Sequence, residues 1–434
     1  MLFRITLLCF LLFGSKLISQ TNYISFNLTS SEELTTLLKS NNNGIDIGKQ
    51  TIDLRFSKKI NFKMNKNYSV NYHSRIVDKD SQLYFNEIGL TVEKNHYLFS
   101  IGKINDNNFY IPENSSGSML FSNNYEPIPE IRFSISKKNI AKNIVYSALI
   151  SHGILDKNAD FYERPYLHRK YLFFDIGDIE KGNFLTIGLD HAAVWGGATT
   201  IYSYGDLGRS LSDWYNVVLA KHGESVNLNG PQGNHLGILH LSYSFVKNNT
   251  PYYMYYQKFW EDGGSLWHTH HPIWDGLWGF NIEQDDKALT VEYLKTTYQS
   301  GNYHPNGIDS YYWHIPYTFG WEYRDFTIGN FQISKDSNRV ESIYVSFSNK
   351  INSNIKLNGI LNILNRYKIA YQDKGWNEEI DLSNDSYVTH KMLKLRVDFL
   401  NNKKSKLDYY YEIGLEKSID DSNIAHRLGI KYSF

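Results

Sequence analysis

The sequence predicts an all-β fold, specifically a transmembrane antiparallel β-barrel. Three observations predict it: strands that alternate apolar and polar residues, an aromatic C-terminal residue, and an apolar N-terminal leader. The last strand sets Leu428, Ile430, Tyr432 and Phe434 against Arg427, Gly429, Lys431 and Ser433. The assembly machinery for outer-membrane barrels recognises an amphipathic strand with an aromatic end. We therefore expect the strand ending at Phe434 to bind that machinery, and the chain to reside in the outer membrane of a Gram-negative bacterium.

The N-terminus predicts a cleaved signal peptide over residues 1–19. Arg4 supplies a positive charge, residues 5–13 form a short apolar run, and Ser19 is a small residue at a cleavage point before Gln20. This run is too short to span a bilayer, which needs about 20 apolar residues. Cys9 is the only cysteine and lies in this segment, so we expect neither disulfides nor cysteine catalysis in the mature chain.

Composition favours an exported barrel over other classes. No other stretch approaches the length of an apolar membrane helix, and the mean hydropathy is −0.45, which excludes a helical inner-membrane protein. Aromatic residues nevertheless make up 15% of the chain, including 34 tyrosines. A barrel needs apolar residues only at alternate positions, with aromatic girdles at the membrane interfaces. The formal net charge is zero and no basic run is present, so we expect no nucleic-acid partner.

Alternating strands separated by polar turns extend from residue 50 to residue 434. Clear examples are residues 355–363, 393–399 and 407–416. A soluble antiparallel sheet also alternates, so the prediction depends on these strands together with the two chain ends. Roughly 20 residues for each strand and its connection predict about 18 strands, within a range of 16 to 20. A barrel of this width has a lumen that wall side chains alone do not fill.

Two helices are expected outside the strands. Ser30 and Glu33 have capping-box spacing, and the leucines that follow predict a helix over 31–40, in a periplasmic segment 20–49 near the barrel rim. Helical spacing is also present in a long loop, and the lumen is one place for that loop to fold. The residues with this spacing are Leu211, Trp214, Tyr215, Val218 and Leu219.

Residues 260–278 form the densest mixture of aromatic and polar residues. His268 and His270 have a spacing that could bind a metal on an extended strand, but no second cluster completes a site, so we expect no metal and no cofactor. The mixture suits saccharides better, because indole rings stack on sugar C–H faces while polar groups bind hydroxyls. A structural aromatic girdle is an equally good interpretation of any single tryptophan.

Patterns typical of catalysis are mostly absent. The chain has no G-x-S-x-G elbow, no H-E-x-x-H helix and no phosphate-binding glycine loop. A pair of carboxylates for glycoside cleavage stays open, because their separation cannot be read from sequence. We expect no enzymatic activity, and an outer-membrane hydrolase is the least favoured alternative.

Several segments together resemble the Wzi-type capsule assembly proteins. They are residues 127–133, 164–171, 188–197, 233–237, 275–279 and 292–301. The resemblance covers about 50–434. It implies an 18-stranded outer-membrane barrel that acts as a lectin, attaching exported capsular polysaccharide to the cell surface, and that is neither an enzyme nor the export channel. Members of the family can carry a periplasmic helical bundle, whereas this chain shows one short N-terminal helix.

The leading hypothesis is therefore a polysaccharide-binding protein whose loops and barrel mouth hold the ligand. The residues expected to stack on sugars are Trp195, Trp267, Trp274, Trp278 and Trp313. Those expected to supply hydrogen bonds or charge are Arg164, His191, Asp262, His268, Asp275 and His304. The alternative is a porin or substrate-specific diffusion channel, suggested by inward charges such as Lys394, Arg396, Glu412 and Glu416.

Overall fold

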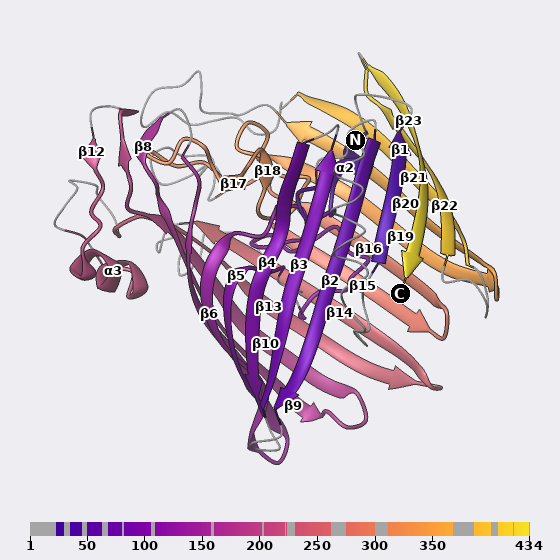
Figure 1. Cartoon of the computed structure of the whole chain (residues 1–434), viewed down its shortest axis with the longest axis horizontal. Helices are drawn as coiled ribbons and strands as arrows, with labels where there is room; N and C mark the ends of the chain where they lie inside the picture. The colour runs from indigo at the N-terminus through magenta and orange to yellow at the C-terminus, as the bar shows by residue number, and fades with distance from the viewer. Residues whose placement is uncertain are drawn as a thin grey trace.

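A computed structural model of the chain shows a wide barrel of tilted strands (Figure 1). Of the helices in the described part of the chain, none is long and apolar enough to cross a membrane. The structure describes residues 23–29, 35–45, 50–62, 68–79, 82–105, 109–157, 160–201, 204–221, 223, 231–261, 275–299, 311–367, 386–400, 407–419 and 421–433.

Eighteen strands form one closed antiparallel sheet, which confirms the predicted fold class and strand number. They are β1 (Tyr23–Thr29), β2 (Gln50–Phe62), β3 (Tyr68–Lys79), β4 (Gln82–Lys94), β5 (Tyr97–Lys103), β6 (Pro129–Ala141), β7 (Ile144–Ile154), β9 (Tyr166–Asp178), β10 (Asn183–Trp195), β13 (Asn234–Lys247), β14 (Thr250–Glu261), β15 (Gly276–Gln284), β16 (Lys287–Lys295), β19 (Val340–Asn352), β20 (Ile355–Tyr367), β21 (Tyr387–Phe399), β22 (Leu407–Lys417) and β23 (Ser422–Ser433). Each pairs with its neighbours along the chain, and β1 pairs with both β2 and β23 to close the barrel.

The wall begins earlier than residue 50, where the sequence placed its start. Strand β1 lies within the segment 20–49 that was expected to be periplasmic, and Tyr23 is opposite Ser433 while Leu28 is opposite Gln50. Without β1, both β2 and β23 would expose an unpaired edge, which a barrel in lipid cannot tolerate. The correction follows from closure, because a seven-residue strand is a weak pattern on its own.

The wall alternates as predicted, with apolar side chains outside and polar ones inside. On β10, Ile187 and Leu189 are exposed on the outer face, whereas Thr186 and Asp190 are buried on the inner face. This alternation is the pattern of a strand with lipid on one side and a polar interior on the other.

The two ends of the barrel differ. At the end where β1 begins and β23 finishes, connections are short, and several are two-residue hairpins such as Asn248-Asn249, with φ of 52° and 60°. The longest connections, 104–128, 196–233 and 296–339, lie at the other end. We call these the turn end and the loop end. In bacterial barrels short turns face the periplasm and long loops face outward.

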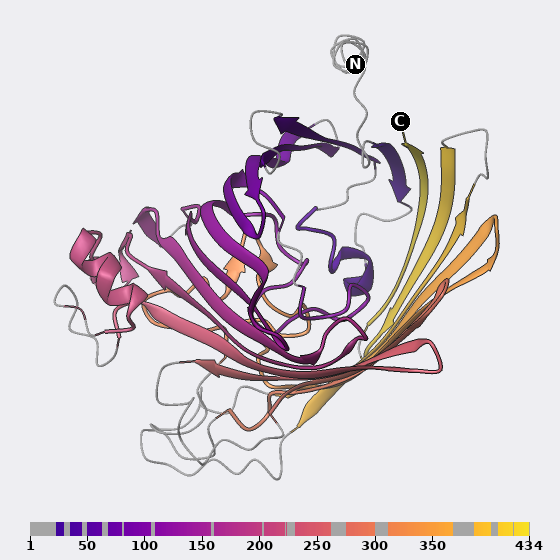
Figure 2. The ribbon, with the colours of Figure 1, turned by 90° about the horizontal axis from the view of Figure 1, so that it is seen from below.

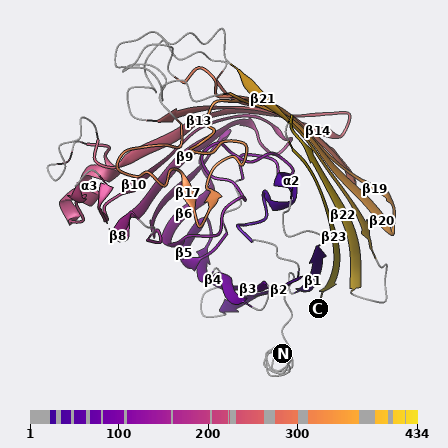
Figure 3. The same ribbon diagram turned by 90° about the horizontal axis from the view of Figure 1, so that it is seen from above.

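Loop segments fold back and fill much of the lumen (Figures 2 and 3). Residues 109–128 and 311–339 contribute the fully buried side chains Met119, Tyr312 and Trp321 to the main apolar core. Trp321 donates from Nε1 to the carbonyl of Leu120 at 2.6 Å, which joins the two segments. We call these segments, together with residues 35–45, the plug.

The N-terminal helix is shorter than expected and lies elsewhere. Helix α2 (Thr36–Lys39) covers only part of 31–40, and Ser30 and Glu33 lie outside the described residues. It belongs to the β1–β2 connection at the loop end and lies inside the barrel, not at a periplasmic rim (Figure 3). The carboxylate of Glu416 on β22 accepts from the Thr36 amide at 2.8 Å, and Leu38 packs over Gly414. The leucine stripe thus packs inside the lumen.

The second expected helix is present as α3 (Leu211–Val218), with a capping box between Ser210 and Asp213. It does not enter the lumen but lies outside the wall near the loop end (Figure 2). The loop end also carries a small sheet and a hairpin. Their strands are β8 (Phe161–Glu163), β11 (Ala198–Thr199), β12 (Gly205–Asp206), β17 (Glu322–Tyr323) and β18 (Phe326–Thr327).

Candidate ligand-binding site at the loop end

The candidate site is centred on the tight hairpin that joins β17 to β18. Tyr323 pairs with Phe326, so Arg324 and Asp325 form a two-residue turn, with φ of 51° and 66°. Both values are positive, as a type I′ turn requires, and glycine or asparagine normally occupies such positions. Each strained residue costs on the order of 1 kcal/mol, a cost found most often at functional sites. The turn presents Arg324 at the mouth of the barrel.

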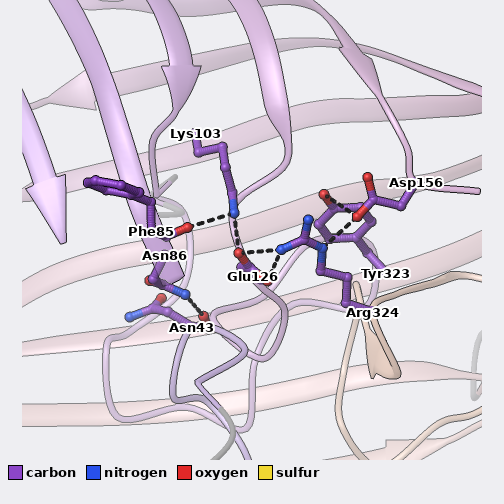
Figure 4. Close-up of polar contacts among 8 residues, drawn as sticks. All are labelled: Asn43, Phe85, Asn86, Lys103, Glu126, Asp156, Tyr323 and Arg324. Atoms are coloured by element: carbon purple, nitrogen blue, oxygen red, sulfur yellow. Dashed lines mark hydrogen bonds and ion pairs between the residues drawn. The ribbon is translucent and has the colours of Figure 1, made fainter. Parts of the chain in front are cut away.

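The guanidinium of Arg324 bridges two carboxylates from two other loops (Figure 4). Its Nε donates to Oδ2 of Asp156 at 2.6 Å, and its Nη1 donates to both carboxylate oxygens of Glu126 at 2.9 Å. The side chains of Arg324 and Asp156 remain 42% and 38% exposed, whereas that of Glu126 is only 5% exposed. One face of this cluster is therefore anchored in protein and the other is open to solvent.

Glu126 is held in place from the wall and from the plug. Lys103 at the end of β5 forms an ion pair with it and also donates to the carbonyl of Phe85 at 3.0 Å. The loop after α2 passes beside it, where Asn86 donates to the carbonyl of Asn43 at 3.0 Å (Figure 4). The position of Arg324 thus depends on the loops that carry Asp156 and Glu126 and, through Glu126, on Lys103 of the wall.

The local electrostatics keep the arginine charged. Partial burial acts against the charge, but the hydrogen bonds that the guanidinium donates to Asp156 and Glu126 raise the pKa of Arg324 above its ordinary value. Burial, reinforced by the charge of Asp156, also raises the pKa of Tyr323 above its usual range, although Arg324 opposes this shift. The site therefore offers a permanent cation, which lies beside the buried, neutral phenol of Tyr323.

The loop that carries Asp156 supplies further exposed groups. Tyr162 is 52% exposed on β8, and Arg164 is exposed immediately before Pro165. An exposed phenol ring can stack on a sugar face, while carboxylates accept from hydroxyls and guanidinium groups donate to hydroxyls or carboxylates. This combination is suited to binding a saccharide. Within the described residues, no three histidine, cysteine, aspartate or glutamate side chains are placed to hold a metal ion.

Two of the expected site residues, His191 and Trp195, lie on the outer face of strand β10 but contact different partners. His191 contacts His235, with 2.9 Å between Nε2 and Nδ1, and stacks on Trp260. Trp195 is buried, and its ring centroid lies 5.0 Å from that of Tyr166. Both side chains are therefore buried against other side chains of the protein and do not form an open surface for a ligand.

Two more expected residues have contacts of a structural kind. The buried carboxylate of Asp275 accepts from the amides of Tyr298 at 3.0 Å and Gln299 at 2.8 Å, which ties down the chain after β16. Trp278 faces outward on β15 and lies 4.2 Å from Tyr256 between ring centroids, a placement typical of an aromatic girdle.

The remaining expected residues divide by location. Arg164 is exposed at the loop end, and Trp313 is half-buried within the plug. The others lie outside the described residues: Trp267, Trp274, Asp262, His268 and His304. All these assignments stay predictions, and the structure does not gather them into one pocket.

Sequence reasoning did not identify Arg324, Glu126 or Asp156. The one available signal was the position of Glu126 beside the Pro127–Phe133 segment used for the family resemblance. An Arg-Asp pair is not a recognised turn sequence, so nothing local marked Arg324. The ion pairs join residues 168 and 198 positions apart, and such pairs become visible only after folding.

Fold and site define a class of protein: a closed outer-membrane barrel with a filled lumen and a polar site among its loops. Sequence comparison then places the chain: it belongs to the capsule assembly protein Wzi family, whose model matches residues 21–358, more than half of the chain. The resemblance seen in the sequence is thereby confirmed. No curated protein sequence matches significantly.

Solved structures align with this chain over most of its length. One is Wzi of Escherichia coli, described as an outer membrane protein involved in group 1 capsule assembly and a carbohydrate-binding β-barrel. It aligns with a TM-score of 0.62 and 13% identity, covering 95% of this chain and 84% of that one. OccD3 (OpdP) of Pseudomonas aeruginosa aligns with a TM-score of 0.48 and 10% identity, covering 96% of this chain and 92% of that one. At these identities the comparison establishes the fold alone.

Proposed function

We propose that this protein binds capsular polysaccharide at the cell surface and holds it there. Family membership supports polysaccharide as the class of ligand. The cluster around Arg324 supports the loop end as the place where the ligand binds. The single observation that carries the proposal is the guanidinium that a strained turn holds, half exposed, between two carboxylates. Such a fixed and charged group binds sugar hydroxyls or uronate carboxylates without first having to be ordered.

We propose further that the protein is not an enzyme. The side chains in the cluster are paired with one another as cations and anions, an arrangement suited to binding. A polymer retained by many such contacts needs only modest affinity at each site, because neighbouring repeats bind together.

The diffusion-channel alternative is less well supported. The plug places the fully buried side chains Tyr312, Trp321 and Arg339 within the barrel. A porin requires a continuous water-filled lumen, whereas these side chains pack against one another and against the wall. The fold therefore favours binding of a ligand at the loop end over passage of a ligand through the lumen.

The apolar outer wall supports outer-membrane lipid as a second partner. The C-terminal strand pairs with β1 through Tyr432, opposite Ile24, and we propose that this strand, ending at Phe434, is recognised by the barrel assembly machinery. Phe434 itself lies outside the described residues, as does the proposed signal peptide 1–19. All these proposals agree with an outer-membrane protein exported through the periplasm.

The test compares cell-bound with released capsule after the gene is deleted and then restored. We expect deletion to release most of the capsule, and the chain carrying Arg324→Gln to restore retention severalfold less well than the unaltered chain. Arg209→Gln is the matched control, because Arg209 is also a half-exposed loop arginine in an ion pair, with Asp206. It should restore retention fully.

Unchanged capsule after deletion would contradict the proposed function. Equal retention by the two arginine variants would contradict the proposed site but not the function. Barrel content in the membrane fraction must be equal for all variants, and heat-modifiable mobility in detergent gels checks that each has folded.

A further inference from the structure

The outer wall carries a polar patch where lipid-facing residues would be expected. Arg169 and Leu167 point into the lumen, so the alternate residues His168 and Lys170 of β9 face outward. The neighbouring strands add His191 and His235, which contact each other. The three histidines are almost fully buried. Because polar side chains are costly against hydrocarbon, something must cover this patch near the membrane.

Helix α3 covers the loop-end edge of this patch. Its residues Trp214 and Val217 pack against Ala193, Trp195 and Tyr166 at the loop-end edge of the patch. Lys170 donates from Nζ to the carbonyl of Val218 at the end of the helix. One side of α3 is therefore bound to the barrel wall by apolar packing and by a hydrogen bond.

The opposite side of α3 is apolar and uncovered. Leu211, Tyr215 and Leu219 are 84%, 51% and 46% exposed, and their spacing of four residues puts them on one stripe. The ammonium group of Lys221 lies 5.1 Å from the centroid of the Tyr215 ring. An apolar stripe that contains a tyrosine, with a lysine just beyond its C-terminal end, is the composition of a helix that lies at a membrane surface.

The stripe continues an apolar surface that already belongs to the wall. Leu172 and Leu189 are exposed on the same strands, β9 and β10, on the turn-end side of the covered patch. Wall and helix together thus present apolar side chains on both sides of the polar patch. This continuity decides in favour of lipid as the occupant of the stripe.

We propose that α3 is an interfacial helix that inserts its apolar stripe among the acyl chains of the outer leaflet, with Lys221 at the level of the lipid phosphates. It thereby seals the histidine patch from lipid and anchors the loop between β10 and β13. This inference rests on the outer-membrane placement under the proposed function, and the experiment below separates the two.

The experiment uses single cysteines in the full-length chain carrying Cys9→Ser, since Cys9 is the only native cysteine. Leu211→Cys and Tyr215→Cys report on the stripe, Leu172→Cys on the barrel wall, and Ser212→Cys on an exposed polar position of the same helix. Each is labelled with an environment-sensitive fluorophore and reconstituted in vesicles with brominated or ordinary phospholipid. Aqueous iodide is the second quencher.

We expect brominated lipid to quench positions 211, 215 and 172 severalfold more than position 212, and iodide to show the reverse order. Iodide quenching of 211 and 215 while 172 stays in lipid would overturn the proposal but leave the barrel in its membrane. Iodide quenching of 172 as well would overturn the membrane placement itself. In detergent, positions 211 and 215 could instead be protected from iodide, with cysteine cross-links between copies of the chain. That result would assign the stripe to contact with a second copy and would also overturn the proposal.

Discussion

Charged side chains inside the barrel are arranged differently on its two sides, the β9–β10 side and the β20–β23 side. Where β9 and β10 meet the plug, Arg169 pairs with Asp190 at 2.7 Å, both nearly inaccessible, and Tyr110 of the plug donates to the same carboxylate at 2.8 Å. Against β20–β23, the charges instead line a cavity of about 510 Å³ at the turn end. Arg396, for example, pairs with Asp398 and stays about one-third exposed.

The difference shows that the plug fills the β9–β10 side of the lumen, whereas on the β20–β23 side its residues 40–41 and 113–115 reach the wall but leave a cavity. Buried charges are tolerated where loop residues complete their hydrogen bonds, and elsewhere water must do so. On the filled side, side chains of the plug pack against those of the wall. On the β20–β23 side, the inward charges that the sequence predicted are present, and they line a cavity.

The largest effect is expected from breaking a pair on the filled side. Arg169→Ala would leave Asp190 charged and buried, at a cost of about 3–5 kcal/mol in unfolding free energy. The guanidinium also lies 3.9 Å from the Phe121 ring centroid, so the plug would loosen. Denaturant unfolding in detergent measures the loss.

Arg396→Ala is the matched control, an inward arginine on the open side. Arg427 and Lys394 still compensate Glu412 after this change, and water reaches Asp398. We expect a cost of about 1 kcal/mol or less, as for exposed ion pairs. Equal costs for the two variants would show that the halves of the lumen do not differ as described.

A smaller effect is expected from displacing the plug at Gly44. Its φ is +62°, and an added Cβ would lie 2.2 Å from the backbone nitrogen of Glu126. Gly44→Ala should push residues 35–45 away, increase cleavage there by added protease, and raise conductance in planar bilayers. Gly205→Ala is the control, because its φ is +67° but its nearest neighbour, the Tyr162 hydroxyl, lies 4.0 Å away.

Gly205→Ala therefore isolates the backbone cost, about 1 kcal/mol, from the clash. If Gly44→Ala keeps the conductance and protease resistance of the control, residues 35–45 do not help to close the barrel.

The smallest effect concerns pH. Burial raises the pKa of Asp275 to about 6, against the opposing hydrogen bonds from Gln299 and Tyr298. A folded-state pKa above the unfolded value means that the folded chain binds the extra proton. Its stabilising contribution is complete below about pH 4 and is lost as the pH rises to about 6. The stability difference between the wild type and Asp275→Asn should change in this window, measured by thermal unfolding. A difference that is constant from pH 4 to 7 would contradict it.

Much of the wall could be predicted from the sequence because alternation is a local property. The strands at 355–363, 393–399 and 407–416 each show their two faces within a few residues. The start of the barrel could not be predicted in the same way, because β1 is short and is defined by its pairing with β2 and β23. The helix at 211–218 was visible from its spacing, but its position outside the wall was not.

The site was harder to predict for a related reason. Tryptophans and histidines suggested saccharide binding, yet Trp195 packs beneath α3 and His191 packs against Trp260. Arg324, which nothing in the sequence marked, lies at the mouth. Residue type indicates what a side chain can bind, but exposure decides whether it does so.

By itself the sequence determined the class of protein: an exported antiparallel barrel with apolar residues outside, since a two-residue period and the two chain ends depend only on neighbouring positions. Only the tertiary structure decided what fills the lumen and which charges meet. Glu126 and Arg324 are 198 residues apart, and their contact exists only because two long loops fold into the same barrel mouth.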